Sequence, residues 1–233
     1  MRLSIIIPTL DEEEHLGPTL EQALQVADEV CVSDGGSRDG TVELARRLGA
    51  RVVVGGPGRG GQLNRGAETC SGDVLLFLHA DTRLPEAARA DIEAQIGQGR
   101  VGGGFHARYE TGPSYLLGPG NWLIRRRTAW TGCPLGDQCQ FVRRDVFEEM
   151  GGFQPWPILE DLDFIHRLRR QGQIALLDGP ALTSARRFES QGVVRTTATN
   201  WWIWTLYFLG VPPRSLARFY GRGRRSGEPD GIA

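Results

Sequence analysis

The first hundred residues alternate between short apolar runs and longer segments whose apolar residues recur every three or four positions. Short continuous apolar runs are typical of buried strands, and the longer period is typical of amphipathic helices. The predicted strands cover 3–8, 29–34, 51–54 and 73–78. The predicted helices cover 12–26, 37–49, 61–70 and 85–96. This alternation favours an α/β fold with a doubly wound, mostly parallel sheet.

After residue 100 the pattern is less regular. Residues 113–132 fit neither period, and 192–220 predict two helices separated by Pro212-Pro213. The other predicted elements are a strand over 101–110, a strand running into a short helix over 138–153, a helix over 160–172 and a strand over 173–178. No linker or repeat interrupts the pattern, so we expect one domain over 1–221 and a disordered Gly/Arg-rich tail over 222–233.

The composition is that of an ordinary soluble protein. Of its 233 residues 40% are hydrophobic and the formal net charge is −1, which predicts no general attraction to nucleic acid. No apolar run approaches the ~20 residues of a membrane-spanning helix, and the N-terminal run is too short for a signal peptide, which favours the cytoplasm. All 27 basic residues are arginines, which excludes a Walker A loop, a Schiff-base enzyme and a lysine base. The four cysteines lie far apart, which favours reduced thiols over a zinc site.

Acidic side chains follow three of the predicted strands. They are Asp11 and Glu12 after the first strand, Asp34 at the end of the second, and Asp81 after the fourth, in the sequence His79-Ala80-Asp81. Ligands of open α/β sheets bind at the carboxyl ends of the strands. Each of these turns taken singly is explained by capping, but together they favour a pocket for a nucleotide and a metal ion.

Three further segments carry candidate chemistry, each with a structural alternative. The glycine-rich "GPGRGG" over 56–61 fits a dinucleotide pattern, but it occupies the third strand–helix turn, so a phosphate or base loop with Arg59 and Asn64 as donors is favoured. The carboxylates of "LEDLD" over 159–163 either stabilise a helix start or face a cleft. Arg186 and Arg187 are either surface charge or a fork for a diphosphate.

Taken together, the motifs resemble those of family 2 glycosyltransferases, in the same order over residues 3–190. The compact form, with "LHADT", "LEDLD" and "NWW…YFLGVPP", is similar to a small stand-alone bacterial branch whose members are commonly encoded beside radical-SAM or arsenosugar-type gene clusters. The motifs are PT-x-[ND]-E (8–12), DGGS-x-DGT (34–41), N-x-G (64–66), the strand-end Asp81, R-R-x-x-F-x-x-x-G-G-F (143–153) and Glu160-Asp161.

The resemblance implies a GT-A fold, a nucleotide-sugar donor that is often a UDP-sugar, a Mn²⁺ or Mg²⁺ ion, and inversion at the anomeric carbon. It implies that Asp161 is the catalytic base with Glu160 beside it, and that Asp81 is the metal ligand. His79 stands where the family more often has Asp, so it binds either the metal or the ribose, and we expect metal binding to weaken below about pH 6.5 as it protonates. The implied nucleotide-sugar-binding residues are Pro8, Thr9, Leu10, Glu12, Asp34, Arg59, Asn64, His79, Ala80, Asp81, Arg186 and Arg187.

Within the domain the resemblance implies a nucleotide-binding half (1–100), an acceptor and catalytic half (101–190) and C-terminal helices (191–221). The acceptor is a hydroxyl compound of unknown identity. Residues 201–211 either pack against the acceptor side or lie on a membrane surface and present a lipid-linked acceptor, at the inner membrane face. A homodimer is a further alternative. Two other functions stay open: a catalytically degenerate nucleotide-sugar-binding module, and an NAD(P)-dependent oxidoreductase that uses "GPGRGG".

Overall fold

The protein is described here from a computed structural model that covers residues 1–110, 117–186, 188 and 192–220. The predicted tail over 222–233 and Arg187 lie outside the described residues. Within them the strands form one eight-stranded sheet in the order β3-β2-β1-β4-β7-β6-β8-β5. The strands are β1 (Leu3–Thr9), β2 (Glu29–Asp34), β3 (Arg51–Val54), β4 (Val74–Phe77), β5 (Thr82–Arg83), β6 (Gly102–Glu110), β7 (Phe141–Arg143) and β8 (Ile174–Ser184).

The sheet is mostly parallel, as predicted. Strands β3, β2, β1 and β4 run parallel to one another, and β6 runs parallel to β8. Strand β7 is antiparallel to both of its neighbours and joins these two groups. Because β1, β2 and β4 are parallel, the segments that follow them open on one edge of the sheet.

Helices cover both faces of the sheet. The side chains of β1 alternate between two cores: Ile5 and Ile7 pack with α1, α2 and α4, whereas Ile6 packs with α3, α6 and α7. The helices are α1 (Glu13–Val26), α2 (Thr41–Arg47), α3 (Arg59–Thr69), α4 (Ala88–Gly97), α5 (Leu117–Thr131), α6 (Arg144–Glu149), α7 (Glu160–Gln171), α9 (Val193–Phe208) and α10 (Pro213–Tyr220).

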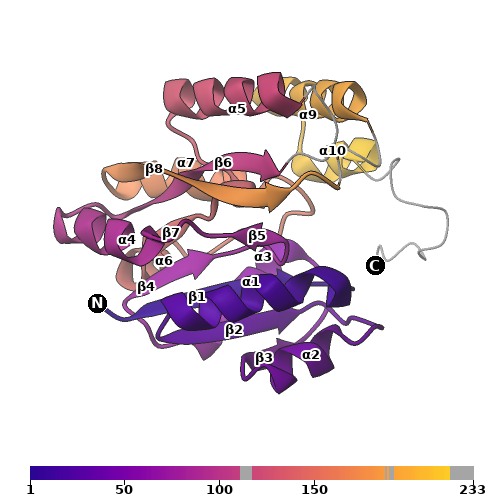
Figure 1. Ribbon diagram of the computed structural model, residues 1–233. Helices are drawn as coiled ribbons and strands as arrows, with labels where there is room; N and C mark the ends of the chain where they lie inside the picture. The colour runs from indigo at the N-terminus through magenta and orange to yellow at the C-terminus, as the bar shows by residue number, and fades with distance from the viewer. Residues whose placement is uncertain (111–116, 187, 189–191, 221–233) are drawn as a thin grey trace.

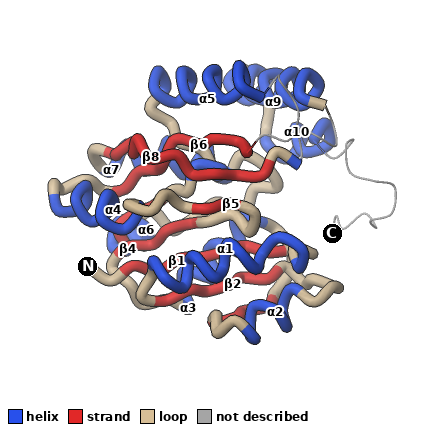
Figure 2. The backbone as a smooth tube through the Cα atoms, viewed as in Figure 1, coloured by secondary structure: helices blue, strands red, loops and turns tan. Residues whose placement is uncertain are grey.

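Helices α5, α9 and α10 lie together at one end of the molecule, beyond β6 and β8, and α2 and β3 lie at the opposite end (Figure 1). Figure 2 shows the same three helices in blue above the red strands of the sheet. Among the described residues no helix is long and apolar enough to cross a membrane. The four cysteines are buried free thiols.

Two elements, α5 and β5, were not predicted from the sequence pattern, and β8 continues to Ser184, beyond its predicted end at 178. Residues 117–131, for which neither period fits, form α5, and the Asn121 side chain ties this helix to β6 through both the N–H and the C=O of Tyr109 (2.9 and 3.2 Å). Strand β5 was not predicted; it pairs antiparallel with β8, and Thr82 Oγ1 lies 2.8 Å from Thr183 Oγ1. Both elements depend on contacts distant in sequence, which a local period does not record.

Candidate active site

The turn after β2 is organised around the buried carboxylate of Asp34. Its Oδ1 accepts hydrogen bonds from the backbone N–H groups of Gly36 and Ser37 at 2.8 Å each. Its Oδ2 accepts from Thr9 Oγ1 at 3.0 Å and from the Ser37 hydroxyl. Asp34 therefore joins the ends of β1 and β2, and Ser37 is part of this turn.

Two amide side chains of α3 position the neighbouring loops. Gln62, which the sequence analysis missed, donates from Nε2 to the carbonyl oxygens of Thr9 (2.7 Å) and Ser33 (3.0 Å). Asn64 donates to the carbonyl of Phe153 and accepts from its N–H, both at 2.9 Å; its predicted binding of the nucleotide-sugar stays a prediction. Its amide is thus occupied in fixing the Gly-Gly-Phe turn after α6.

Glu12 and Asp81 meet the same guanidinium, that of Arg186. The Arg186 Nη1 and Nη2 atoms lie 2.8 and 2.5 Å from the two carboxylate oxygens of Glu12, and its Nε lies 3.1 Å from Asp81 Oδ2. Burial raises the pKa of Asp81, Arg186 opposes that shift, and Glu12 adds to it. Pro8 and Leu10 lie close by in sequence, at the end of β1 and just after it.

The site formed by the Glu12 and Asp81 carboxylates fits a divalent cation in its charge and in its donor atoms. Two carboxylates converge on one positive group, and carboxylate oxygens are the ligands that Mg²⁺ and Mn²⁺ prefer. Over the described parts of the chain, no three His, Cys, Asp or Glu side chains come together as a metal site. The fit is therefore to a cation that takes its remaining ligands from a bound diphosphate.

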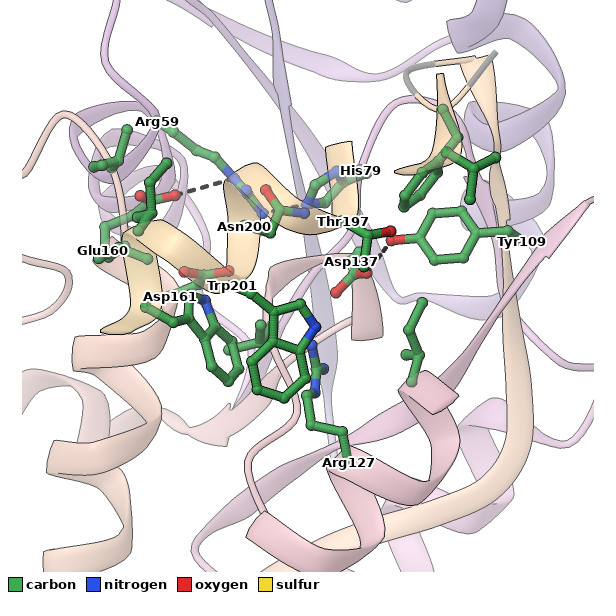
Figure 3. A pocket seen from close by; sticks show the side chains of 18 of the residues that line it. Arg59, His79, Tyr109, Arg127, Asp137, Glu160, Asp161, Thr197, Asn200 and Trp201 are labelled. Carbon is green, nitrogen blue, oxygen red and sulfur yellow. Dashed lines mark hydrogen bonds and ion pairs between the residues drawn. The ribbon is translucent and has the colours of Figure 1, made fainter. Parts of the chain in front are cut away.

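A second group of predicted residues meets in a cavity of about 350 Å³ between the start of α7 and helices α5 and α9 (Figure 3). Arg59 Nε lies 3.4 Å from Glu160 Oε1, and the Arg59 guanidinium also contacts His79 Nε2. Burial raises the pKa of Glu160, with Asp161 adding to the shift and Arg59 opposing it. Arg59, the first residue of α3 and part of the glycine-rich segment over 56–61, thus reaches this cavity.

The pH behaviour expected for His79 is wrong. Burial lowers the pKa of its imidazole well below 6.5, and the positive charges of Arg59 and Arg186 lower it further. The ring therefore stays neutral at pH 6.5. The Nε2 atom of His79 contacts the Arg59 guanidinium. The predicted binding of a metal ion by His79 stays a prediction.

Asp161 is held at the cavity by two backbone N–H groups. Its Oδ2 accepts from the N–H of Gly136 and its Oδ1 from the N–H of Leu162, both at 2.8 Å. Leu159, two residues earlier, has φ +64°, a left-handed conformation that is uncommon for a bulky residue and that tends to occur at functional sites. Asp161 is therefore an oriented carboxylate that faces open space.

Several cavity residues escaped the sequence analysis. Asp137 accepts a hydrogen bond of 2.5 Å from the Tyr109 hydroxyl, and Arg127 lies with its Cζ 5.0 Å from the Trp204 ring centroid. Figure 3 shows Thr197, Asn200 and Trp201 of α9 on the same cavity. Asn200 and Trp201 belong to the segment "NWW…YFLGVPP" of the family resemblance, but no motif marks Tyr109, Arg127, Asp137 or Thr197.

The chain belongs to glycosyl transferase family 2, whose family model matches residues 4–151. It is 34% identical over 94 residues to an uncharacterized glycosyltransferase of Rickettsia typhi, which is 40% of this chain and 32% of that protein. It is 30% identical over 170 residues to an undecaprenyl-phosphate 4-deoxy-4-formamido-L-arabinose transferase of Pseudomonas fluorescens, which is 64% of this chain and 48% of that protein. The match to the Rickettsia protein thus spans about a third (32%) of that relative's length.

Among solved structures the chain is similar to glucosyl-3-phosphoglycerate synthase of Mycobacterium tuberculosis, solved with Mn²⁺, UDP and glucosyl-3-phosphoglycerate. The TM-score is 0.58 at 22% identity, over 84% of this chain and 79% of that one. This likeness confirms the fold, which is of the GT-A type.

Proposed function

We propose that the chain is an inverting, metal-dependent glycosyltransferase of the hexosyltransferase type, which transfers a sugar from a UDP-sugar to a hydroxyl acceptor. The observation that carries the proposal is the Asp161 carboxylate, which lines a cavity and is oriented by the N–H groups of Gly136 and Leu162. An oriented carboxylate at the acceptor hydroxyl is what a single displacement at C1 requires.

In this mechanism Asp161 accepts the proton of the acceptor hydroxyl while the hydroxyl oxygen attacks the anomeric carbon. The bond from that carbon to the diphosphate oxygen breaks, the electron pair leaves with the nucleoside diphosphate, and the configuration inverts. Glu160 does not need to act as an acid, since the diphosphate leaves without protonation. Its ion pair with Arg59 supports the position of the cavity wall beside Asp161.

Asp81 and Glu12 would hold the divalent ion together with the donor diphosphate. A Mn²⁺ or Mg²⁺ ion bound there supplies positive charge against the developing charge of the leaving group. Arg186 contributes a fixed positive charge at the same place, a guanidinium suited to phosphate oxygens. The solved glucosyl-3-phosphoglycerate synthase contains Mn²⁺ and UDP, which supports this choice of cofactor and donor.

Other residues predicted from the sequence are part of the proposal. Pro8, Thr9, Leu10 and Asp34 line the nucleoside, and Ala80 and His79 lie beside the ribose or metal. The predicted role of Arg187 in binding the diphosphate falls on a residue outside the described parts of the chain and stays a prediction. The division into 1–100, 101–190 and 191–221, the cytoplasmic location at or near the inner membrane face, and a lipid-linked acceptor or a homodimer stay predictions.

A degenerate nucleotide-sugar-binding module is the second candidate, and the His79 contact with Arg59 is the observation that favours it, because a carboxylate is more usual there. The oxidoreductase alternative has less support, since the "GPGRGG" loop follows β3, the strand at one edge of the sheet.

One experiment separates the candidates. Thermal shift with UDP, GDP, CDP, dTDP and NAD, with and without Mn²⁺, identifies the ligand, and UDP release from a panel of UDP-sugars measures turnover. We expect UDP with Mn²⁺ to stabilise the protein, and Asp161→Asn to lower UDP release by 10²- to 10⁴-fold while UDP binding persists. Asp178→Asn, at an exposed carboxylate, is the matched control. UDP binding without turnover would support the degenerate module, and stabilisation by NAD alone would support the oxidoreductase.

A further inference from the structure

Large apolar side chains are exposed along α5 and α9. We define as the aromatic face Trp122, Trp130, Trp201, Trp202, Phe208 and Leu209, each of which is more than half exposed, up to 89% for Trp130. A soluble surface rarely gathers so many aromatic rings without a binding partner. The other exposed large hydrophobic side chains among the described residues are Met1, Val54 and Val194, of which Val194 also belongs to α9.

The two helices present this surface together. Trp130 of α5 and Trp201 and Phe208 of α9 line one cavity of about 270 Å³. Helices α5, α9 and α10 form a layer at one end of the molecule (Figure 1). Half of the aromatic face, namely Trp130, Trp201 and Phe208, therefore meets between α5 and α9.

This layer is also strongly basic. Its three helices contain no acidic residue, although the chain has 28 acidic residues and a net charge of −1. The Arg126 guanidinium lies 5.4 Å from the Trp122 ring centroid, so a cation and an aromatic ring are presented side by side. The arginines of the layer are Arg125, Arg126, Arg127, Arg195, Arg214 and Arg218.

We propose that the aromatic face and the arginines of this layer dock the protein onto the surface of an anionic lipid bilayer. Tryptophan prefers the interface between headgroups and acyl chains, and arginine keeps its charged end among the phosphates. Anionic headgroups complement a layer that has arginines and no carboxylates. A symmetric contact with a second copy of the chain would place the same arginines against one another, which like-charge repulsion opposes.

The docked orientation would bring the active-site cavity close to the bilayer. Arg127, Trp201 and Trp204 line both the cavity beneath the aromatic face and the cavity that contains Asp161. An acceptor anchored in the bilayer would then have a short path to Asp161, a consequence that rests on the proposed function. The docking itself does not rest on the proposed function, so the test of docking does not require a measurement of glycosyl transfer.

The test is co-sedimentation of the full chain with vesicles of phosphatidylcholine alone and of phosphatidylcholine with 30% phosphatidylglycerol. We expect binding to the anionic vesicles only, with a blue shift of tryptophan emission, and weakening as salt rises from about 0.05 to 0.5 M. Trp130→Ala with Trp202→Ala, and separately Arg125→Gln with Arg126→Gln, should each lower the partition coefficient at least about fivefold. The matched control, Arg46→Gln with Arg47→Gln, changes an exposed arginine pair on α2 at the opposite end of the molecule and should bind as the wild type does.

Three results would overturn the proposal. The first is no binding to the anionic vesicles at low salt. The second is an equal loss in the α2 control, because the effect would then be one of total charge. The third is a dimer in light scattering that Trp130→Ala with Trp202→Ala dissociates while neither protein binds vesicles, since the aromatic face would then be an interface between copies. Circular dichroism of each variant ensures that a loss reflects docking rather than unfolding.

Discussion

Arg186 and Asp81 form an ion pair across the strand ends, with Arg186 Nε 3.1 Å from Asp81 Oδ2, and the same guanidinium binds both carboxylate oxygens of Glu12. The residue predicted to hold the metal is thus paired with a protein cation. A metal ion bound at Asp81, as we propose, would therefore compete with Arg186 for one carboxylate.

Removing that cation should change metal and nucleotide binding in opposite directions. In Arg186→Met we expect Mn²⁺ to bind the nucleotide-free protein roughly 3- to 10-fold more tightly, since it no longer displaces an ion pair worth about 1 kcal/mol. UDP affinity should fall, because a diphosphate contact is lost. Electron paramagnetic resonance of free Mn²⁺ and calorimetry with UDP measure the two effects. Arg89→Met, which removes ion pairs to Asp28 and Glu93, is the control; weaker Mn²⁺ binding in Arg186→Met would contradict the competition.

A side chain at position 136 should lower activity by disturbing Arg59 and Asp161. A Cβ at this position would overlap the Arg59 guanidinium and lie 3.0 Å from Asp161 Oδ2, so Gly136→Ala must displace one or both. We expect UDP release to fall about 10- to 100-fold, because small displacements of a catalytic group are costly, with a melting temperature within a few degrees of wild type. Gly17→Ala adds the same methyl group in open space and should leave UDP release unchanged. Equal activity in both variants would mean that the position of Asp161 does not limit the reaction.

The raised pKa of Glu160 should make the protein less stable as the pH rises. Between the usual value of 4.5 and the raised one, the folded state holds a proton that the unfolded state has released, so the free energy of unfolding decreases with pH there. Glu160→Gln lacks this titration, so the difference in melting temperature between variant and wild type should shift in favour of the variant as pH rises from 4.5. Differential scanning fluorimetry over pH 4.5–8 measures it, with Glu68→Gln, at an exposed site, as the control. Parallel profiles for wild type and Glu160→Gln would contradict the assigned shift.

Asn64 should matter for stability rather than for nucleotide binding. Its side chain is the partner of both the N–H and the C=O of Phe153, and Asn64→Ala leaves these groups without that partner. We expect a loss of about 2 kcal/mol in the free energy of unfolding, measured by urea denaturation, with little change in UDP affinity. Gln98→Ala, at an exposed amide after α4, should change stability by less than about 0.5 kcal/mol. A large loss of UDP affinity in Asn64→Ala with unchanged stability would contradict this expectation and support the predicted nucleotide-binding role.

Strands β1 to β4 could be predicted within about a residue because their apolar runs are continuous and flanked by polar turns. Parallel strands covered on both faces produce that pattern locally. Residues 113–132 produced no clear period, because α5 is exposed on one side through Trp122 and Trp130 and is held to β6 by the Asn121 side chain.

The candidate site residues also divide into those that the sequence predicted and those that only the structure revealed. Glu160, Asp161, His79 and Arg59 stood in motifs, and the structure brings these four to one cavity. The partners that orient them were not foreseeable: Gly136 is one glycine among 32 in the chain, and nothing in its neighbours indicates that its N–H binds Asp161.

The order of residues along the chain was therefore sufficient for the α/β class and for the family, and it singled out the carboxylates to which we assign the proposed chemistry, since these depend on short-range periods and on residue types at fixed spacing. Packing between distant segments decided the rest. Packing placed the Arg186 guanidinium within ion-pair distance of Asp81. It lowered the pKa of His79 through burial and neighbouring guanidinium groups. It also brought aromatic side chains of α5 and α9 together at one cavity. Hydrogen bonds, burial and charge act through space, and a linear pattern does not contain the distances on which they depend.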